Sequence, residues 1–504
     1  MSPKAIAAID LGTTSCRAEL FSLEGETLGR HAVEYRIVSH EPDAAEQEAL
    51  GWWSAACECM REAVKQAEIG GEDVIALGFS TQGHSWVPTD ADFRPLRAAF
   101  TWLDRRSAGY AEELLQEMGA EYWGKLAGKT PGPWHMLPQI LWLREHQPHI
   151  LKAARHLLFA QDFLIARLTG KPVTDSTTAA ASLFFDITHN RWDPRLLEHY
   201  ELDPERLPQV AAAGTVVGPL TREAAAQMGL STETVAVTGA QDQKCAALGA
   251  GLAPGIGTAS LGTATAISAL RERPKFDPAV PIPCFPYLEK GTWVLEAALT
   301  TTGGAVNWLR DALRPIKEDL SYTDLMRLAS EAPTGSGGVA FFPYPAGAGT
   351  PHMRFDASAA FAGINLSTTA SSLARAVLEG CAYEIATALG AMQQAGCHIE
   401  QLFVFGGGAR SKLWTQIIAA VVGVPLYACQ EAETAIRGAA MLAARGAMEP
   451  EQAAALQDAL RSPATAVTVS EKLRARYRAL FERYARAREQ YWRFQNALTQ
   501  EEEQ

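Results

Sequence analysis

The expected fold follows from the stretch Ala8-Ile9-Asp10-Leu11-Gly12-Thr13-Thr14-Ser15, because a similar turn recurs at Ala259-Ser260-Leu261-Gly262-Thr263-Ala264-Thr265. Each copy follows one apolar, strand-like run and precedes another, so each is expected to be a hairpin turn. A glycine followed by small hydroxyl residues lets backbone N–H groups and threonine hydroxyls point at one anion. Two such hairpins predict two related halves that face one polyphosphate, as in a nucleotide-dependent phosphotransferase.

Composition agrees with two large globular domains and restricts the partners. The chain has 504 residues, of which 47% are hydrophobic and 20% are charged. Its net charge of −12 argues against nucleic acid and anionic membrane surfaces as partners. No apolar run reaches the ~20 residues that a membrane span needs, and no signal-peptide pattern precedes the first strand. The eight cysteines show no metal-site spacing, so we expect free buried thiols and a cytoplasmic location.

Strand-like and helix-like segments alternate along the chain, which predicts an α/β fold. The expected strands are Ala5–Asp10, Ser15–Ser22, Thr27–Val38, Val74–Phe79, Thr234–Gly239, Trp293–Ala298, Gln401–Phe405 and Leu426–Ala428. The expected helices are Trp52–Gln66, Tyr110–Met118, Leu137–His146, Ile150–Thr169, Lys244–Gly249, Thr302–Leu313, Ser371–Ala395, Ser411–Val422 and Thr434–Arg445. The helical spacing of apolar residues between Leu473 and Tyr491 predicts a packed C-terminal helix. The repeated hairpin makes internal duplication the economical explanation of the two halves.

Two aspartates are candidates for the chemistry. Asp10 ends a buried strand directly before the first glycine turn, where a carboxylate can hold Mg²⁺ against phosphates. The structural alternative is an aspartate that only caps the turn. Asp242 follows a strand in the loop Gly239–Gln243, where a carboxylate can accept the proton of an attacking hydroxyl. The alternative for Asp242 is a helix N-cap.

Two glycine-rich segments could approach a nucleotide. Gly406-Gly407-Gly408 follows a strand and opens a helix, and Gly303-Gly304 precedes another helix. A helix N-terminus favours anions, and missing side chains let a ligand approach the backbone. Both segments can equally be tight turns, and the first departs from the dinucleotide fingerprint because Ser411 replaces its last glycine.

The segments Thr81–Trp86 and Thr101–Arg106 predict a polar pocket. Gln82, His84, Asp104 and Arg105 can divide the donors and acceptors of a polyol, while Trp102 supplies a flat apolar wall. The alternatives are a structural histidine at position 84 and a surface ion pair of Asp104 with a neighbouring arginine.

Taken together and in this order, these motifs resemble the FGGY carbohydrate kinases, a family within the superfamily of actin, hexokinase and the heat-shock chaperone ATPases. The resemblance runs from Ala5 to about Gly446. It implies two ribonuclease-H-like domains around a central ligand cleft, and transfer of a phosphoryl group from Mg·ATP to a sugar or polyol. Three parts of the chain are expected. Residues 1–250 form an N-terminal domain with the sugar site, the first phosphate hairpin and the catalytic base. Residues 251–450 form a C-terminal nucleotide-binding domain, and residues 451–504 form a helical extension.

The resemblance also implies a role for each motif residue. Asp242 corresponds to the general base and Asp10 to the metal ligand. ATP would be bound by Gly12, Thr13, Thr14, Gly262, Thr263, Gly303, Gly304, Gly407, Gly408 and Lys412. The sugar would be bound by Gln82, His84, Trp102, Asp104, Arg105, Asp242 and Gln243.

Two motifs bear on the identity of the sugar. Gln82 and His84 match the Gln-Met-His-Gly motif of the xylulokinase branch, which favours a ketopentose such as D-xylulose. Gly83 replaces the methionine of that motif. Gly347-Ala348-Gly349 replaces a Gly-Glu-Arg pattern that the same branch carries before Thr350-Pro351-His352. Glycerol, ribulose, erythritol or a sugar acid such as gluconate therefore stay open as substrates, and the expected partners are a small sugar, ATP and a second copy in a homodimer.

Two other classes compete with a sugar kinase. An actin-like or chaperone-like ATPase would act on a protein partner, but little chain follows Leu473 to form a peptide-binding domain. A sugar sensor without catalysis is disfavoured by the intact Asp10 and Asp242. Sugar-dependent ADP release separates all three classes.

Overall fold

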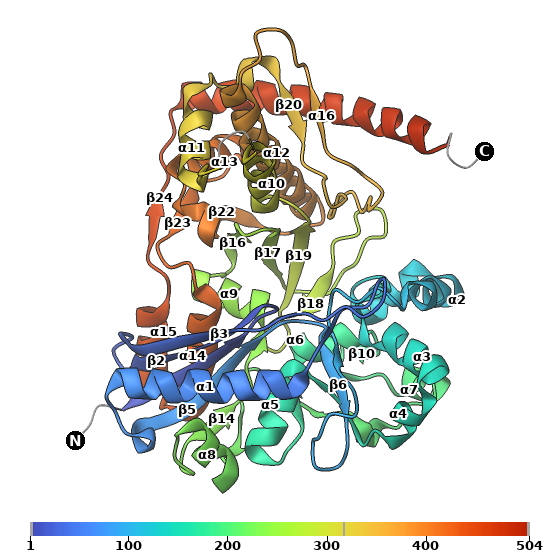
Figure 1. Ribbon diagram of the computed structural model, residues 1–504, viewed down its shortest axis with the longest axis vertical. Coiled ribbons are helices and arrows are strands. Elements are labelled where there is room, and N and C mark those ends of the chain that lie inside the picture. The colour runs from blue at the N-terminus through green and yellow to red at the C-terminus, as the bar shows by residue number, and fades with distance from the viewer. Residues whose placement is uncertain (1–3, 316–317, 501–504) are drawn as a thin grey trace.

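Two large sheets organise the chain, which the computed structural model describes over residues 4–315 and 318–500 (Figure 1). The strands of the first sheet are β1 (Ala5–Leu11), β2 (Ser15–Ser22), β3 (Thr27–Glu34), β5 (Val74–Thr81), β13 (Val216–Pro219), β14 (Val235–Val237) and β15 (Ala240–Gln241). Their spatial order is β13-β14-β5-β1-β2-β3, and β15 pairs with the end of β5. This sheet forms the lower half of the molecule in Figure 1.

The second sheet repeats the topology of the first. Its strands are β16 (Gly255–Ser260), β17 (Thr265–Arg271), β18 (Cys284–Pro286), β19 (Trp293–Leu299), β22 (Ile399–Phe405), β23 (Leu426–Cys429) and β24 (Ala464–Ala466). They lie in the order β18-β19-β17-β16-β22-β23-β24. In both sheets an antiparallel hairpin, β1–β2 or β16–β17, is extended by two parallel strands, β5 and β14 or β22 and β23. The predicted α/β fold is confirmed, and the repeated strand order is the one that an internal duplication would produce.

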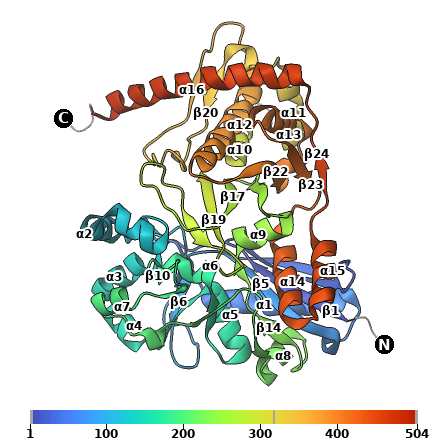
Figure 2. The ribbon, with the colours of Figure 1, turned by 180° about the vertical axis from the view of Figure 1, so that it is seen from behind.

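One helix from each half lies between the two sheets. These helices are α9 (Asp242–Ala250) and α14 (Thr434–Ala447), and they cross where glycines allow close contact. A Cβ atom on Gly438 would lie 2.0 Å from the Cys245 carbonyl oxygen, and one on Gly249 would lie 2.1 Å from the Thr434 carbonyl oxygen. Because α14 also packs on β1 and β5, the chain returns from the second half to the first sheet, as Figure 2 shows.

The remaining helices of the two halves cover the outer faces of the sheets. In the first half these are α1 (Ala49–Ala67), α5 (Ala160–Thr169) and α8 (Arg222–Met228). In the second half they are α10 (Gly303–Leu313), α11 (Tyr322–Glu331), α12 (Ala370–Gln394) and α13 (Lys412–Val421), beside the β20 (Ala340–Phe342) and β21 (Ala360–Ala362) ribbon. After α15 (Pro450–Leu460), α16 (Glu471–Gln500) packs on the second half through the buried Tyr477 and Tyr484, which confirms the packed C-terminal helix.

An additional lobe is inserted in the first half and has its own apolar core. It contains α2 (Ala108–Ala127), α3 (Met136–His146), α4 (Pro148–Ala153) and α7 (Pro194–His199), beside a sheet of β4 (Glu46–Gln47), β7 (Ala99–Phe100), β6 (Trp86–Thr89) and β8 (His156–Phe159). The short elements β9 (Val173–Asp175), α6 (Ser176–Ala179), β10 (Phe185–Asp186), β11 (Arg191–Trp192) and β12 (Gln209–Ala211) connect this lobe to the first sheet. The described helices include none that is both long and apolar enough to cross a membrane.

The prediction of one helix over Ile150–Thr169 is wrong. The structure divides this segment into the end of α4, the strand β8 and the helix α5. Strand β8 forms because it pairs with β6, which lies about seventy residues earlier, and local apolar spacing carries no information on such a pairing. The strand expected over Thr27–Val38 ends at Glu34. The helix expected over Tyr110–Met118 breaks at Gly119, whose φ of 79° is not helical, and α2 resumes after this kink to Ala127.

Candidate functional site

Three strand ends bring the candidate acids together. In the first sheet Asp10 lies opposite Ser80 of β5, and Ser80 lies opposite Ala240 of β15. The Ser80 hydroxyl donates a 2.6 Å hydrogen bond to Oδ1 of Asp10. Burial raises the pKa of Asp10, while the Ser80 hydrogen bond and the Arg17 charge oppose that increase. Asp10 therefore lies at the sheet edge where parallel strands end, the usual position of α/β ligand sites.

Asp242 is the first residue of α9, directly after β15. Its Oδ1 accepts a 2.7 Å hydrogen bond from the backbone N–H of Gln243, and the N-cap position belongs to Gln241, so Asp242 is not the helix cap. Burial, and next the charge of Asp10, raise the pKa of Asp242 to about 7. A carboxylate with a pKa near the working pH is suited to accept a proton as a general base.

A lysine next to Asp242 joins the two halves. Lys244 of α9 makes a 2.9 Å ion pair with Glu296 of β19, and its Nζ lies 3.7 Å from the centre of the Phe285 ring. Lys129, from the inserted lobe, lies 3.9 Å from the same ring, and burial lowers its pKa to about 7. The helix turn that carries Asp242 is thus fixed against the second sheet.

In each predicted phosphate hairpin the glycine N–H closes the turn, over three residues in the first hairpin and over two in the second. The N–H of Gly12 donates to the Ser15 carbonyl at 2.9 Å, and the N–H of Gly262 donates to the Ala264 carbonyl at 3.2 Å. Thr14 and Thr263 are exposed at the tips of these turns, and Thr13 is partly exposed. Their hydroxyls and the free turn amides are groups that can bind phosphate oxygens.

The second hairpin is held by the glycines expected at the nucleotide site. The N–H of Gly303 donates to Gly262 at 3.1 Å and that of Gly304 to Thr263 at 2.9 Å, and a Cβ atom on Gly303 would lie 2.3 Å from the Gly262 carbonyl oxygen. These two glycines are therefore needed for packing, and their contact with ATP stays a prediction.

The triple-glycine segment lies on the other side of the same hairpin. The N–H of Gly408 donates to the Leu261 carbonyl at 2.9 Å, and a Cβ atom there would lie 2.6 Å from the Trp414 ring. A Cβ atom on Gly407 would meet no atom within 4 Å, and Gly407 is exposed. Lys412 is exposed in the first turn of α13. Gly407 and Lys412 are accessible to a ligand, whereas Gly408 has a packing role.

The expected sugar pocket contains buried polar atoms whose hydrogen-bonding capacity is not used by the described residues. Among the described residues, no hydrogen-bond partner is found for Nδ1 of His84, Nε2 of His135, Nε2 of Gln139 or Nε2 of Gln241. The His84 and His135 rings meet edge to face with centroids 5.1 Å apart. Burial, and next the charges of Lys129 and Lys244, lower the pKa of His84 to about 3, so His84 is neutral. Neutral imidazole and amide groups are suited to sugar hydroxyls.

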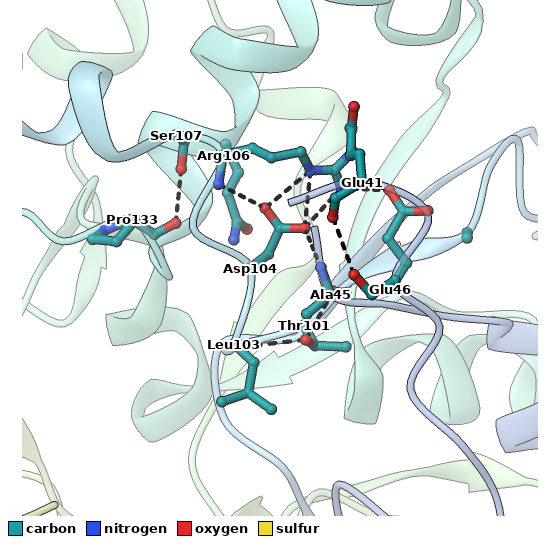
Figure 3. A network of polar contacts seen from close by, with 12 residues as sticks. Glu41, Ala45, Glu46, Thr101, Leu103, Asp104, Arg106, Ser107 and Pro133 are labelled. Carbon is teal, nitrogen blue, oxygen red and sulfur yellow. Dashed lines mark hydrogen bonds and ion pairs between the residues drawn. The ribbon is translucent and has the colours of Figure 1, made fainter. Parts of the chain in front are cut away.

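The contacts of Asp104 and Arg105 are with other parts of the protein, although both residues are expected to bind the sugar. Figure 3 shows the Asp104 carboxylate between the Ala45 amide and the Arg106 guanidinium. Ala45 N–H donates to Asp104 at 3.0 Å, and Arg106 Nη2 donates to it at 2.7 Å. Arg105 is exposed and lies 4.9 Å from the centre of the Trp134 ring. Asp104 thus supports the Thr101–Arg106 turn, and sugar contact by these two residues stays a prediction.

Sequence reasoning missed three residues of this site: His135, Gln241 and Lys244. Gln241 was within a quoted motif, and a Cβ atom on Gly83 would lie 3.0 Å from its Nε2. The side chain of Gln241 therefore occupies the space that a larger residue at position 83 would fill. His135 follows the Pro-Gly-Pro loop, which gave no signal of a site.

The carboxylates present fit a magnesium ion of the kind that acts with phosphates. No group of three or more His, Cys, Asp or Glu side chains that could hold a metal is found in the described part of the chain. Mg²⁺ in phosphoryl transfer is commonly held by one or two carboxylates together with waters and phosphate oxygens. Asp10, with Asp242 near it, satisfies that smaller requirement. Separately, a small pocket lies in the second half, bordered by Thr301, Tyr344 and His352, and includes neither aspartate.

Comparison with known proteins gives consistent matches over both halves. The model of the FGGY family of carbohydrate kinases matches with its N-terminal domain over residues 5–249 and with its C-terminal domain over residues 257–447. The chain is 24% identical to a xylulose kinase of Staphylococcus xylosus, covering 88% of this chain and 90% of that protein. It is 30% identical to a glycerol kinase of Janthinobacterium sp., and the match covers 87% of this chain and 89% of that protein. The solved xylulose kinase of Rhodospirillum rubrum superposes with a TM-score of 0.90 at 26% identity, covering 98% of this chain and 100% of that one.

Proposed function

Because this chain belongs to the FGGY family of carbohydrate kinases, we propose that it transfers the γ-phosphoryl group of ATP to a ketopentose such as D-xylulose. The chain is an ATP-dependent sugar phosphotransferase, as its family shows. The choice of a ketopentose rests on the similarity to xylulose kinases and on Gln82 and His84.

The observation that carries the proposal is the position and environment of Asp242. This residue lies at the junction of the two sheets, beside Asp10, and burial raises its pKa to about 7. In the reaction, Asp242 accepts the proton of the sugar hydroxyl while that oxygen bonds to the γ-phosphorus, and ADP leaves with the bridging oxygen. A general base of this kind contributes about 100-fold to 10,000-fold to turnover.

Each half supplies one hairpin for the phosphates. Thr13 and Thr14 of the first hairpin and Thr263 of the second present hydroxyls and backbone amides to the phosphate oxygens. Asp10 would hold Mg²⁺, and the bound ion would neutralise phosphate charge. Gly407 and Lys412 lie along the nucleotide on the second sheet, and Gln243 borders the sugar beside Asp242.

One observation favours a second substrate class. Gly83 replaces the methionine of the xylulokinase motif, and the Gln241 amide lies where that methionine side chain would be. This exchange adds a hydrogen-bonding group at the pocket wall, which suits a more polar acceptor such as another polyol or a sugar acid. The similarity to a glycerol kinase agrees with this alternative.

A coupled assay of ADP release over ketopentoses, polyols and sugar acids tests the proposal. We expect D-xylulose or a related ketopentose to stimulate ADP release most strongly. Stimulation by glycerol or gluconate alone would replace the ketopentose with the second class. Strong ATP hydrolysis that no sugar increases would instead favour an actin-like or chaperone-like ATPase. The division at residues 250 and 450, a cytoplasmic location and a homodimer stay predictions.

A further inference from the structure

A closed ring of hydrogen bonds joins the first phosphate hairpin to the expected sugar pocket. Gln47 Nε2 donates to the Thr13 carbonyl at 2.6 Å, and Gln82 Nε2 donates to Gln47 Oε1 at 2.9 Å. The Ser85 hydroxyl donates to Gln82 Oε1 at 3.0 Å and accepts from the Trp102 backbone N–H at 3.3 Å. Trp102 Nε1 then donates to the Thr13 hydroxyl at 2.8 Å, which closes the ring. We call these five residues the polar ring.

The polar ring is built from segments that lie far apart in the sequence. Thr13 is in the first hairpin, Gln47 is in β4, Gln82 and Ser85 follow β5, and Trp102 is in the turn after β7. Gln47, Gln82 and Ser85 are buried, whereas Trp102 is 40% exposed. The ring therefore has a buried interior and one accessible side chain, which lies next to the hairpin that faces phosphate.

Gln47 is the central member of the ring, because only an amide can make its set of contacts. Its Oε1 accepts both from Gln82 and from Trp52 Nε1, the latter at 3.0 Å, while its Nε2 donates to Thr13. A carboxylate of the same shape lacks the N–H group and would face the Thr13 carbonyl with negative charge. An apolar side chain of similar size would leave the Gln82 amide and the Trp52 indole without their acceptor.

The contacts of the ring imply coupling between the two substrates. A sugar that rests against Trp102, or that bonds the remaining N–H of Gln82, orders groups that hold Thr13 at two atoms, its carbonyl and its hydroxyl. A nucleotide phosphate on Thr13 orders the same groups from the other side. Two ligands that each order one shared network bind with positive cooperativity, and the coupling is the same in both directions.

We propose that Gln47 is a positioning residue that couples sugar binding to the first phosphate hairpin through the polar ring. The inference rests on the proposed function and deepens it, because it states why ATP is bound productively when sugar is present. Gln47 itself touches neither substrate. It acts through Thr13 and Gln82.

The test measures MgADP affinity by calorimetry, with and without saturating D-xylulose, in the full-length protein. Wild type is expected to bind MgADP at least about fivefold more tightly when sugar is present, as is typical for coupled sites. Gln47→Leu and Gln47→Glu are expected to reduce this factor below twofold, with sugar affinity in the absence of nucleotide changed less than threefold. Gln66→Leu is the matched control, because Gln66 is an exposed glutamine of α1 that bonds only the Arg30 amide among the described contacts.

Further variants keep the test decisive if both Gln47 variants fold poorly. Ser85→Ala breaks the ring between Gln82 and Trp102 and is expected to reduce the coupling factor. Trp102→Phe removes the bond to the Thr13 hydroxyl and part of the apolar wall, so it is expected to reduce both the coupling factor and the sugar affinity. Wild-type coupling in the folded ring variants would overturn the inference, as would a wild type that phosphorylates sugar but binds MgADP equally with and without it. Absence of any sugar-dependent turnover in wild type would instead overturn the proposed function.

Discussion

Replacing Asp242 by asparagine tests the electrostatic environment on which the assignment of the base rests. Asparagine keeps the shape of the side chain and can still accept the hydrogen bond from Gln243, but it is neutral at every pH. Burial and the charge of Asp10 raise the pKa of Asp242 from 3.8 to about 7 in the folded protein. The folded state thus binds this proton more tightly than the unfolded state. Its contribution to stability is complete below about pH 4 and is lost as the pH rises through about 7.

The size of the effect follows from proton linkage. With these two pKa values, ionised Asp242 lowers the free energy of unfolding by about 4 kcal/mol at pH 8 and by about 1.5 kcal/mol at pH 5, relative to a protonated side chain. Asp242 retains partial exposure, so solvent reduces both values, and we expect about half of the difference, or about 1 kcal/mol. For a domain of this size that corresponds to about 2 to 4 °C in Tm.

The assay is thermal unfolding of wild type and Asp242→Asn at pH 5 and pH 8, at one scan rate. The variant is expected to melt above wild type at pH 8, and the difference in Tm is expected to shrink at pH 5. Asp458→Asn, which changes an exposed carboxylate, is the control and should show the same difference at both pH values. A Tm difference for Asp242→Asn that does not change with pH would refute the reasoning, since Asp242 would then have an ordinary pKa.

Three further predictions concern the pocket, the helix crossing and the C-terminal helix. Gly83→Met places a side chain against Gln241 and displaces it, so the KM of the preferred sugar should change more than about tenfold with little change in Tm. An unchanged KM for every accepted sugar would argue that Gly83 and Gln241 do not form a wall of the sugar pocket. Gly438→Val places side-chain atoms against the Cys245 carbonyl, and calorimetry should show destabilisation by about 3 kcal/mol or insoluble protein, whereas a wild-type Tm contradicts the close crossing of α9 and α14. Burial raises the pKa of Glu384, but His352 and Arg488 outweigh burial and lower the pKa to about 2. The ionised Glu384 carboxylate therefore stabilises the fold fully above about pH 4.5, and this stabilisation is lost as the pH falls through 2. Urea unfolding of Glu384→Gln should therefore show a loss that is about 2 kcal/mol larger at pH 7 than at pH 3, and equal losses would speak against the ion pairs of Glu384 with His352 and Arg488.

Much of the fold could be predicted because its strongest signals are local. The first hairpin is predicted by two apolar, strand-like runs and the glycine turn between them, and β2 has the predicted bounds, Ser15–Ser22. The recurrence of the turn predicted the duplication that the two sheet orders show. The strand β8 was missed because its partner β6 is distant in sequence and its own residues are equally compatible with a helix.

Site residues could be predicted where a motif places them at the end of a strand. Residues whose contacts depend on how separate loops approach one another could not be predicted. Asp10 lies near the end of β1 and Asp242 directly after β15, and these strand ends meet in the sheet, so their proximity follows from topology. His135 reaches the pocket from the loop before α3, and no pattern near it predicts a contact with His84. The bonds of Gln47 to Thr13 and Gln82 likewise join segments whose approach only the folded structure defines.

Sugar-dependent ADP release at pH 8, compared between wild type and Asp242→Asn, tests the central claim most directly. We predict that D-xylulose or another acceptor of the panel stimulates wild type and that the variant loses about 100-fold to 10,000-fold in kcat, with the sugar KM changed less than about threefold. Because asparagine keeps the shape of the side chain but cannot accept the proton, such a loss at a nearly unchanged sugar KM points to the proton transfer. Turnover by Asp242→Asn at the wild-type rate, or a wild type that no sugar stimulates, would contradict the account.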